Sequence, residues 1–253
     1  MKKEKSHKLY RKMGFYERYI KRAIDIFCSG LAIIVFCWLY AIIALLVRIK
    51  LGSPVLFTQY RPGLIDPKTG KERIFKMYKF RTMTDKKDAE GNLLPDEVRL
   101  TKFGAWLRST SLDELPEAFC ILNGTMTLIG PRPQLVRDMV FMSEEQRMRH
   151  TAKPGLSGLA QVSGRNAISW EEKFEWDLKY IKKIGFLTDF KIIFQTVEKA
   201  FVKKEGITTN EMATAEDFGD YLLRNGKINQ MEYNIGQLKA KKILQNVKQL
   251  KGE

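Results

Sequence analysis

The stretch from Ile26 to Val47 reads IFCSGLAIIVFCWLYAIIALLV and contains no charged side chain. As a helix, its 22 residues would measure about 33 Å at ~1.5 Å per residue, against a bilayer hydrocarbon core of about 30 Å. A buried core helix is disfavoured, because apolar side chains occupy every face. A signal peptide is disfavoured too, because the stretch is long and runs into Arg48 without a small-residue cleavage site. We therefore expect this stretch to enter a membrane.

The charges on both sides of this stretch conflict with a simple crossing. Residues 1–22 contain nine Lys or Arg and two acids, which the positive-inside rule places in the cytoplasm. The segment after the stretch is also basic, beginning with Arg48 and Lys50. A helix that bends at Gly30 or within residues 37–40 and returns to the same face would resolve the conflict, although no proline is present. We therefore predict a re-entrant membrane helix.

The net charge of the whole chain is +15, from 44 Lys+Arg and 29 Asp+Glu in 253 residues. Such an excess indicates an anionic partner: nucleic acid, anionic lipid headgroups or phosphorylated substrates. Residues 1–22 and residues 51–204 each have a net charge of +7, whereas residues 205–253 are neutral. A neutral tail without a recognised binding module disfavours nucleic acid and favours membrane lipids and phosphorylated substrates.

Two further segments have the pattern of helices that lie on a membrane surface. Over residues 8–21, aromatic and aliphatic side chains such as Leu9, Tyr10, Met13 and Tyr16 interleave with Lys and Arg. A second helix is expected to open at Thr188-Asp189. Its apolar stripe consists of Phe190, Ile193, Phe194, Val197 and Phe201. For this second stripe, packing in the core and contact with the membrane both remain open.

The remaining composition restricts the chemistry. Two of the three cysteines lie inside the apolar stretch, so the cysteines indicate neither a disulfide framework nor a metal-binding spacing. The two histidines, His7 and His150, leave no His-rich metal site. Neither GxxxxGK[ST] nor GxGxxG occurs. Any chemistry must therefore come from carboxylates and arginines, with or without a metal ion.

A β-hairpin is predicted after the apolar stretch. Residues 55–59 and 74–80 are β-prone and are separated by turn segments that contain proline and glycine. Alternation in the second strand places Lys79 and Arg81 on one face.

The segment Ser111-Leu112-Asp113-Glu114-Leu115-Pro116 admits two interpretations. In the structural one, Ser111 and Glu114 form an S-x-x-E capping box, and Pro116 marks the helix start. In the chemical one, Asp113 lies at a helix N-terminus, where amide dipoles favour a phosphate group, and attacks phosphorus to form an aspartyl phosphate. The segment alone leaves both open.

Cationic and glycine-rich segments further along the chain are suited to hold a phosphate. Arg132 stands between two prolines, a stiff setting that presents its guanidinium at little entropic cost. Residues 153–158 (KPGLSG) and 163–166 (SGRN) form a glycine-rich loop able to offer backbone N–H groups, with Arg165 as a bidentate partner. Together these segments predict an anion pocket near a carboxylate.

At these residues the chain resembles the small monotopic phosphoglycosyl transferases, also called bacterial sugar transferases. The matching segments follow the family's order and are Lys21-Arg22 with Asp25, residues 57–63 (FTQYRPG), 75–83 (FKMYKFRTM), 111–115 (SLDEL), 130–133 (GPRP) and 153–166 (KPGLSG to GRN). The resemblance is closest to members that start bacterial glycans from a UDP-N-acetylated sugar.

The resemblance implies an enzyme of the bacterial inner membrane, facing the cytoplasm, that moves a sugar 1-phosphate from a UDP-sugar to undecaprenyl phosphate. It makes Asp113 the nucleophile on the β-phosphorus, so that UMP leaves and a phosphosugar-aspartyl intermediate remains. Glu114 would orient the site or handle a proton, and Mg²⁺ at Asp113 would screen the pyrophosphate. The residues carried over as phosphate and nucleotide contacts are Lys79, Arg108, Arg132 and Arg165.

One departure from the family's pattern concerns the bend. Family members commonly carry a Ser-Pro pair in the middle of the membrane helix, and the aligned positions here are Cys37-Trp38. The prediction of a re-entrant shape therefore rests on the flanking charges.

We thus predict a mainly helical α+β protein with interfacial amphipathic helices and a small globular domain that contains a β-hairpin. Its predicted parts are a basic interfacial segment (1–22), the membrane helix (23–50), a cytosolic catalytic domain (51–204) and a C-terminal extension (205–253). An amphipathic helix in the extension, with Ile235, Leu238 and Ile243, either packs on the domain or binds a partner.

Partners and alternatives complete the expectations. A homo-oligomer or contact with downstream glycosyltransferases is expected from the resemblance. A non-catalytic membrane scaffold for glycan assembly would tolerate loss of Asp113. A membrane-anchored nucleic-acid binder would show salt-dependent oligonucleotide binding.

Overall fold

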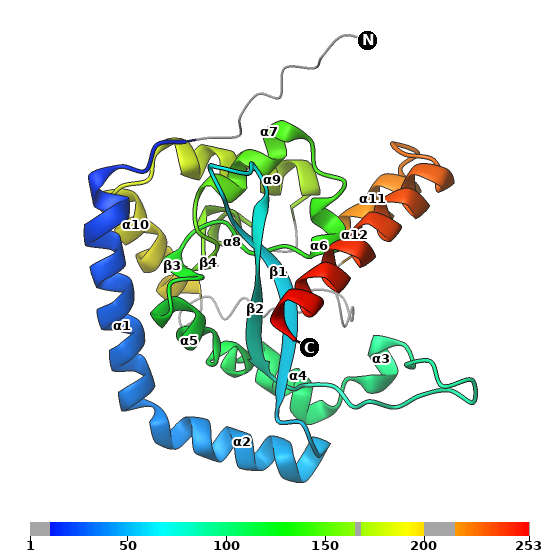
Figure 1. Cartoon of the computed structure of the whole chain (residues 1–253). Coiled ribbons are helices and arrows are strands. Elements are labelled where there is room, and N and C mark those ends of the chain that lie inside the picture. Colours follow the sequence, from blue (N-terminus) through cyan, green and yellow to red (C-terminus); the bar gives the residue numbers. More distant parts are fainter. Residues whose placement is uncertain (1–10, 165–167, 200–215, 253) are drawn as a thin grey trace.

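The computed structural model describes residues 11–164, 168–199 and 216–252 (Figure 1). Leu9, Tyr10, Arg165 and Phe201, which the sequence analysis singles out, lie outside these ranges.

The described chain is an α+β structure in which helices dominate, as predicted. The N-terminal half contains η1 (Tyr16–Ile20), α1 (Lys21–Val35), α2 (Cys37–Leu51), β1 (Leu56–Ile65), β2 (Glu72–Phe80), α3 (Asp96–Arg99), α4 (Lys102–Ser109), η2 (Leu112–Glu114) and α5 (Glu117–Leu122). The remainder contains β3 (Thr127–Ile129), α6 (Val136–Met139), α7 (Glu144–Arg147), η3 (Met148–Thr151), β4 (Gly155–Ser157), α8 (Leu159–Ser163), α9 (Trp170–Lys182), α10 (Phe186–Val197), α11 (Phe218–Arg224) and α12 (Gln230–Lys251).

The apolar stretch forms two helices with a break at Phe36. No helix among the described residues is by itself long and apolar enough to cross a membrane, but Tyr16–Val35 and Cys37–Leu51, bent by 63°, meet that test as a pair. Phe36 donates to the carbonyl of Ala32 and accepts from the N–H of Tyr40, so these hydrogen bonds persist across the break. The break therefore lies beside one of the two predicted points, and it forms without a proline.

Packing of α2 accounts for the bend. Ile43 and Val47 are buried against Phe80 of β2 and Leu107 of α4, and the hydroxyl of Tyr40 donates to the carbonyl of Leu115 at 2.7 Å. A straight continuation of α1 would forfeit these contacts, because it would carry residues 37–51 away from the domain. In Figure 1, α1 descends along one side of the domain and α2 turns beneath it.

The two predicted surface helices begin at other residues than we predicted. Residues 11–14 are not helical, so the first helix begins near Tyr16. α10 begins at Phe186 with Gly185 as its N-cap, and Thr188 does not cap it, because Asp189 is buried in a polar network. The apolar stripe of α10 faces outward rather than into the core. Its exposed members are Phe186, Leu187, Phe190, Ile193, Phe194 and Val197, with Leu187 80% exposed.

The predicted hairpin is confirmed and is longer than predicted. β1 and β2 pair antiparallel from Leu56–Phe80 to Pro62–Ile74, and the register shifts between Pro62 and Ile65. Phe75 and Met77 of β2 form a core with Cys120 and Ile121 of α5 and with Met126. The hairpin thus supports α5, which begins directly after the 111–116 segment.

A short parallel pair, β3 with β4, was not predicted. Thr127 pairs with Gly155 and Ile129 with Ser157. Its backbones approach so closely that a Cβ on Gly158 would lie 2.1 Å from the carbonyl oxygen of Gly130. The N–H of Gly155 donates to the carbonyl of Pro131 at 3.0 Å. These glycines therefore permit close backbone packing, and the Gly155 N–H that we expected to face a phosphate is already used.

The C-terminal extension packs on the domain, which answers one open question. Ala240 of α12 is buried with Val136 and Met139 of α6, and Ile243 packs against the same cluster. The opposite face of α12 stays exposed at Met231, Ile235 and Leu238.

We predict that Gly158→Ala destabilises the fold by about 3 kcal/mol or more, because the added methyl group would meet backbone atoms that cannot move aside. Gly185→Ala is the matched control, since a Cβ there has no heavy atom within 4 Å. Denaturant unfolding in detergent should separate the two variants. Equal unfolding midpoints would contradict the packing described.

Candidate active site

Asp113 sits in a tight turn whose conformation was only partly predicted. Ser111 adopts a left-handed conformation (φ 56°), and its side chain makes no capping hydrogen bond. The predicted Ser111–Glu114 capping box is therefore wrong, because the Glu114 carboxylate binds two cations elsewhere in the chain. Leu112–Glu114 form a single 3₁₀ turn, followed by Pro116 as N-cap of α5. This turn holds Asp113 just ahead of a helix N-terminus, as the chemical interpretation requires.

The Asp113 side chain is nearly buried and has no direct partner. It is 7% exposed, and within the described ranges its carboxylate makes no hydrogen bond or ion pair. Burial raises the pKa of Asp113 to about 6, Lys79 opposes that shift, and the neighbouring Glu114 adds to it. The carboxylate thus lies in a positive field from Lys79, Arg108 and Arg132 without being neutralised by any of them.

Glu114 joins two cations at one oxygen. Its Oε1 accepts from Lys79 Nζ at 2.6 Å and from Arg132 Nη2 at 2.9 Å. Burial penalises the charged form, but Arg132 and Lys79 outweigh it and hold the pKa of Glu114 far below its usual range. Lys79 also lies 3.2 Å from Glu117. The structure therefore brings together Lys79, Glu114 and Arg132, three of the predicted site residues, next to Asp113.

The loop that carries Arg132 is held by its carbonyl groups. Pro131 and Pro133 have no N–H, so the backbone of this loop can be fixed chiefly through its acceptors. The carbonyl of Arg132 accepts from Arg149 Nη2 at 2.7 Å, and that of Pro133 from Arg61 Nη1 at 3.3 Å. With the Gly155 bond to Pro131, all three consecutive carbonyls are bound. The Arg132 side chain itself is 46% exposed, with its Nη2 bound to Glu114.

Arg149 is itself fixed by a buried ion pair. Its side chain is 1% exposed and lies 2.6 Å from Asp177 of α9, whose side chain is 3% exposed. Burying such a pair costs desolvation energy. Its contribution to the loop is that it holds the Arg149 side chain in one position.

The other two predicted cations differ in position. Arg108 Nε donates to Thr82 Oγ1 at 3.0 Å. Burial lowers the pKa of Arg108. The negative charges of Asp113 and Asp96 oppose that shift, and Asp113 opposes it more strongly. The side chains of Arg108 and Asp113 are therefore electrostatically linked. Arg165 lies outside the described residues, and its predicted role stays a prediction.

Sequence reasoning missed three contributors: Glu117, Arg61 and the Arg149–Asp177 pair. Glu117 looks like an ordinary first-turn acid. Arg61 lies in a turn-like Arg-Pro-Gly segment that is in fact part of β1. Arg149 and Asp177 are 28 positions apart, so only the tertiary fold could reveal that pairing.

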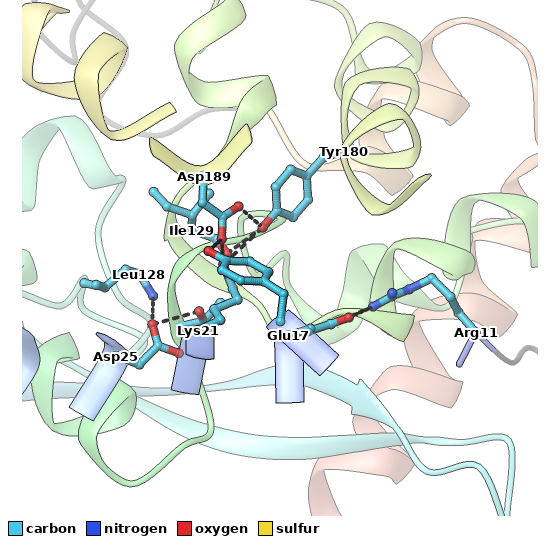
Figure 2. A network of polar contacts seen from close by, with 10 residues as sticks. Arg11, Glu17, Lys21, Asp25, Leu128, Ile129, Tyr180 and Asp189 are labelled. Atoms are coloured by element: carbon cyan, nitrogen blue, oxygen red, sulfur yellow. Dashed lines mark hydrogen bonds and ion pairs between the residues drawn. The ribbon is translucent and has the colours of Figure 1, made fainter. Parts of the chain in front are cut away.

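A second polar cluster anchors the start of α1 (Figure 2). Lys21, the last residue of the segment predicted to lie on the membrane surface, is buried and pairs with Asp189 and the hydroxyl of Tyr180. Asp25 accepts from Thr127 Oγ1 and from the N–H of Leu128.

A cavity of about 250 Å³ beside this cluster is lined by Arg18, Lys21, Arg22 and Lys153, among others. Because Arg22 binds the last carbonyls of α5, this cavity is distinct from the surroundings of Asp113.

Metal binding by protein groups alone has no support here. Among the residues that the structure describes, no three His, Cys, Asp or Glu side chains group so as to hold a metal ion. A metal at Asp113 would therefore have to share its coordination with a ligand or water.

Comparison with known proteins places residues 16–203 under the family model described as bacterial sugar transferase. The chain is 49% identical to the uncharacterized sugar transferase EpsL of Bacillus subtilis, over 78% of this chain and 91% of that protein. It is 38% identical to the UDP-glucose:undecaprenyl-phosphate glucose-1-phosphate transferase of Klebsiella pneumoniae, over 73% of this chain and 40% of that protein. It is 34% identical to the UDP-N-acetylgalactosamine-undecaprenyl-phosphate N-acetylgalactosaminephosphotransferase of Aeromonas hydrophila, over 71% and 43%. The matched region thus spans less than half the length of the last two.

We predict that Asp177→Asn destabilises the protein by about 3 kcal/mol, because it leaves the Arg149 charge buried without a counterion. The double variant Arg149→Met with Asp177→Leu should recover most of that loss, since it removes both charges. Thermal unfolding of the unsubstituted chain, Asp177→Asn, Arg149→Met and the double variant at the same detergent concentration measures this. An additive loss in the double variant would argue against the pairing.

Proposed function

The chain belongs to the bacterial sugar transferase family, and on that premise we propose that it moves a sugar 1-phosphate from a UDP-sugar to undecaprenyl phosphate. The family match agrees with the resemblance seen in the sequence motifs. The observation that carries the proposal is the Asp113 carboxylate, nearly buried and free of direct partners beside Lys79, Arg108 and Arg132. A free carboxylate in a positive field is suited to attack a phosphorus whose oxygens those cations bind.

The proposed reaction has two steps. An Asp113 oxygen attacks the β-phosphorus of the UDP-sugar, the bond from that phosphorus to the bridging oxygen breaks, and UMP leaves with the electron pair. A phosphate oxygen of undecaprenyl phosphate then attacks the aspartyl-bound phosphorus, and Asp113 leaves as a carboxylate. The product is the lipid-linked sugar diphosphate.

Glu114 is proposed to orient the site rather than to move a proton. Arg132 and Lys79 keep it ionised, so it has no proton to donate near neutral pH. Its Oε1 holds both cations in one place, and there they can bind the pyrophosphate oxygens. Arg108, linked electrostatically to Asp113, is proposed as a further phosphate contact.

Mg²⁺ fits this site as a shared ion. Magnesium is commonly held by one or two carboxylates together with substrate phosphates and water, and Asp113 is a carboxylate without a protein partner among the described residues. Asp113 would hold it with the pyrophosphate, and the ion would supply charge neutralisation for phosphoryl transfer.

The sugar is proposed to be N-acetylated, as in the family members that the motifs resemble most. The Aeromonas relative is named for such a sugar and the Klebsiella relative for UDP-glucose. Assaying UMP release from a panel of UDP-sugars would decide the sugar.

A re-entrant position in the membrane is proposed for the bent pair α1 and α2. Large apolar side chains are exposed on both arms, including Phe27 and Ile34 on α1 and Trp38 and Leu45 on α2. Phe119 of α5 is exposed as well, and its ring lies against that of Tyr40 on α2. The exposed stripe of α10 adjoins the start of α1, where Phe186 contacts Tyr16. A catalytic domain anchored in this way at the cytoplasmic face of the inner membrane would meet the lipid phosphate at headgroup depth.

We predict that Asp113→Asn abolishes UMP release from a UDP-sugar in the presence of Mg²⁺ and undecaprenyl phosphate, because an amide cannot attack phosphorus. Asp88→Asn is the matched control, because Asp88 is an exposed aspartate in an earlier segment of the chain, and it should retain full activity. Without the acceptor lipid, the unsubstituted chain should gain the mass of one phosphosugar and the Asp113 variant should not. Release at the unsubstituted rate by Asp113→Asn would refute the mechanism, whereas no release by the unsubstituted chain would favour the scaffold alternative.

We predict that both ends of the chain lie on the same side of the membrane. In a chain whose native cysteines are replaced, single cysteines at Ser6 and Gly252 should both resist a membrane-impermeant maleimide added to intact cells. Both should react after lysis. Labelling of one site and not the other in intact cells would show that the apolar pair spans the membrane.

A further inference from the structure

We infer that the C-terminal helices α11 and α12 position Arg132, so that they are a working part of the active site rather than an appendage. The match to the family model ends at residue 203, so both helices lie beyond the region that the family shares. The inference rests on the proposed function, in which Arg132 binds the pyrophosphate. It depends on how these helices contact α6, which follows the Arg132 loop almost directly.

One buried carboxylate connects the loop to the extension. Asp138 of α6 is 2% exposed. Its Oδ2 accepts from the N–H of Leu135, at the end of the Arg132 loop, at 3.0 Å. Its Oδ1 accepts from the N–H of Phe218, at the start of α11, at 2.9 Å. A shift of α11 would therefore disturb the group that fixes the end of the loop.

A ring seated between two glycines adds a steric connection. Phe141, just after α6, faces Gly219 of α11 and Gly236 of α12, where an added Cβ would lie 2.6 and 2.3 Å from its ring atoms. Tyr233 stacks on the same ring with centroids 6.0 Å apart. The ring is thus confined on three sides, and a side chain at either glycine would push the helices away from α6.

An ion pair and an apolar cluster complete the contact. Arg137 lies 2.6 Å from Asp217, and Val136 and Met139 are buried with Ala240. Figure 1 shows α12 lying across the side of the domain where α6 is found.

These contacts supply a restraint that the rest of the site lacks. The carbonyls of residues 131–133 are held by groups of the shared region, whereas Asp138 holds the N–H of Leu135 while bound to the extension. Loosening the extension would therefore let the loop move at its C-terminal end. Arg132 would then bind the pyrophosphate less tightly, while Asp113, in a different segment, would keep its place.

The test uses Gly236→Ala in the full-length chain. Alanine favours helix over glycine, so any defect would come from the collision with Phe141 and not from fraying of α12. We expect the KM for the UDP-sugar to rise roughly three- to tenfold, a size typical of coupled residues, with a smaller change in kcat. Leu238→Ala, on the exposed face of α12, is the matched control and should leave KM unchanged.

A second background separates positioning from general damage. If α12 acts through Arg132, Gly236→Ala should add nothing to the KM of an Arg132→Gln chain, because the positioned group is already absent. Hydrogen exchange of a peptide covering Leu135 should also quicken in Gly236→Ala and not in Leu238→Ala. Asp217→Asn, which removes only the ion pair with Arg137, is the milder variant if Gly236→Ala lowers the unfolding midpoint sharply.

The inference would be overturned if Gly236→Ala and Leu238→Ala had equal KM and equal exchange at Leu135. It would be overturned equally if the Gly236→Ala effect multiplied undiminished with that of Arg132→Gln. A failure of the unsubstituted chain to release UMP would contradict the proposed function instead, and the exchange measurement would still test the link from α12 to the loop.

Discussion

The carboxylate of Asp25 connects the apolar helix α1 to the candidate site. One of its oxygens accepts from Thr127 and from Leu128 of β3, and β3 leads directly into the loop that carries Arg132. One turn earlier on the same helix, Arg22 binds the carbonyls of Ile121 and Leu122 at the end of α5. Because α5 begins beside Asp113, both halves of the site are held by the first turns of α1.

The bend at Phe36 lets α2 hold the candidate site from the other side. Tyr40 of α2 donates to the carbonyl of Leu115, one residue after the Asp113 turn, while Arg22 of α1 holds the far end of α5. The segment between Leu112 and Leu122 is therefore bracketed by the two arms. A straight helix could supply only one of these contacts, so they favour the break at Phe36 although the stretch contains no proline.

Much of this could be predicted from the sequence, and the exceptions have a common cause. The hairpin, the break near Cys37 and the grouping of Lys79, Glu114 and Arg132 follow from local patterns or from motif order. The Ser111 capping box failed because Lys79 and Arg132, distant in sequence, compete for Glu114. Lys21 ends a segment predicted to lie on the membrane surface, but it is buried because it pairs with Asp189, which is distant in sequence. The strands β3 and β4 have three residues each, too short for any periodicity to show.

The bound carbonyls around Arg132 restrict which residues of the candidate site can be substituted. Every acceptor from Pro131 to Pro133 is occupied, and Gly155 and Gly158 leave no space for side chains beside Gly130. Substitutions here would damage the backbone before they altered any preference for a ligand. On the proposed function, the part of the substrate that Arg132 meets is the diphosphate, which is constant among UDP-sugars. Changes in sugar preference among related chains would then have to arise from residues outside this loop, so new specificities could evolve without rebuilding the backbone around Arg132.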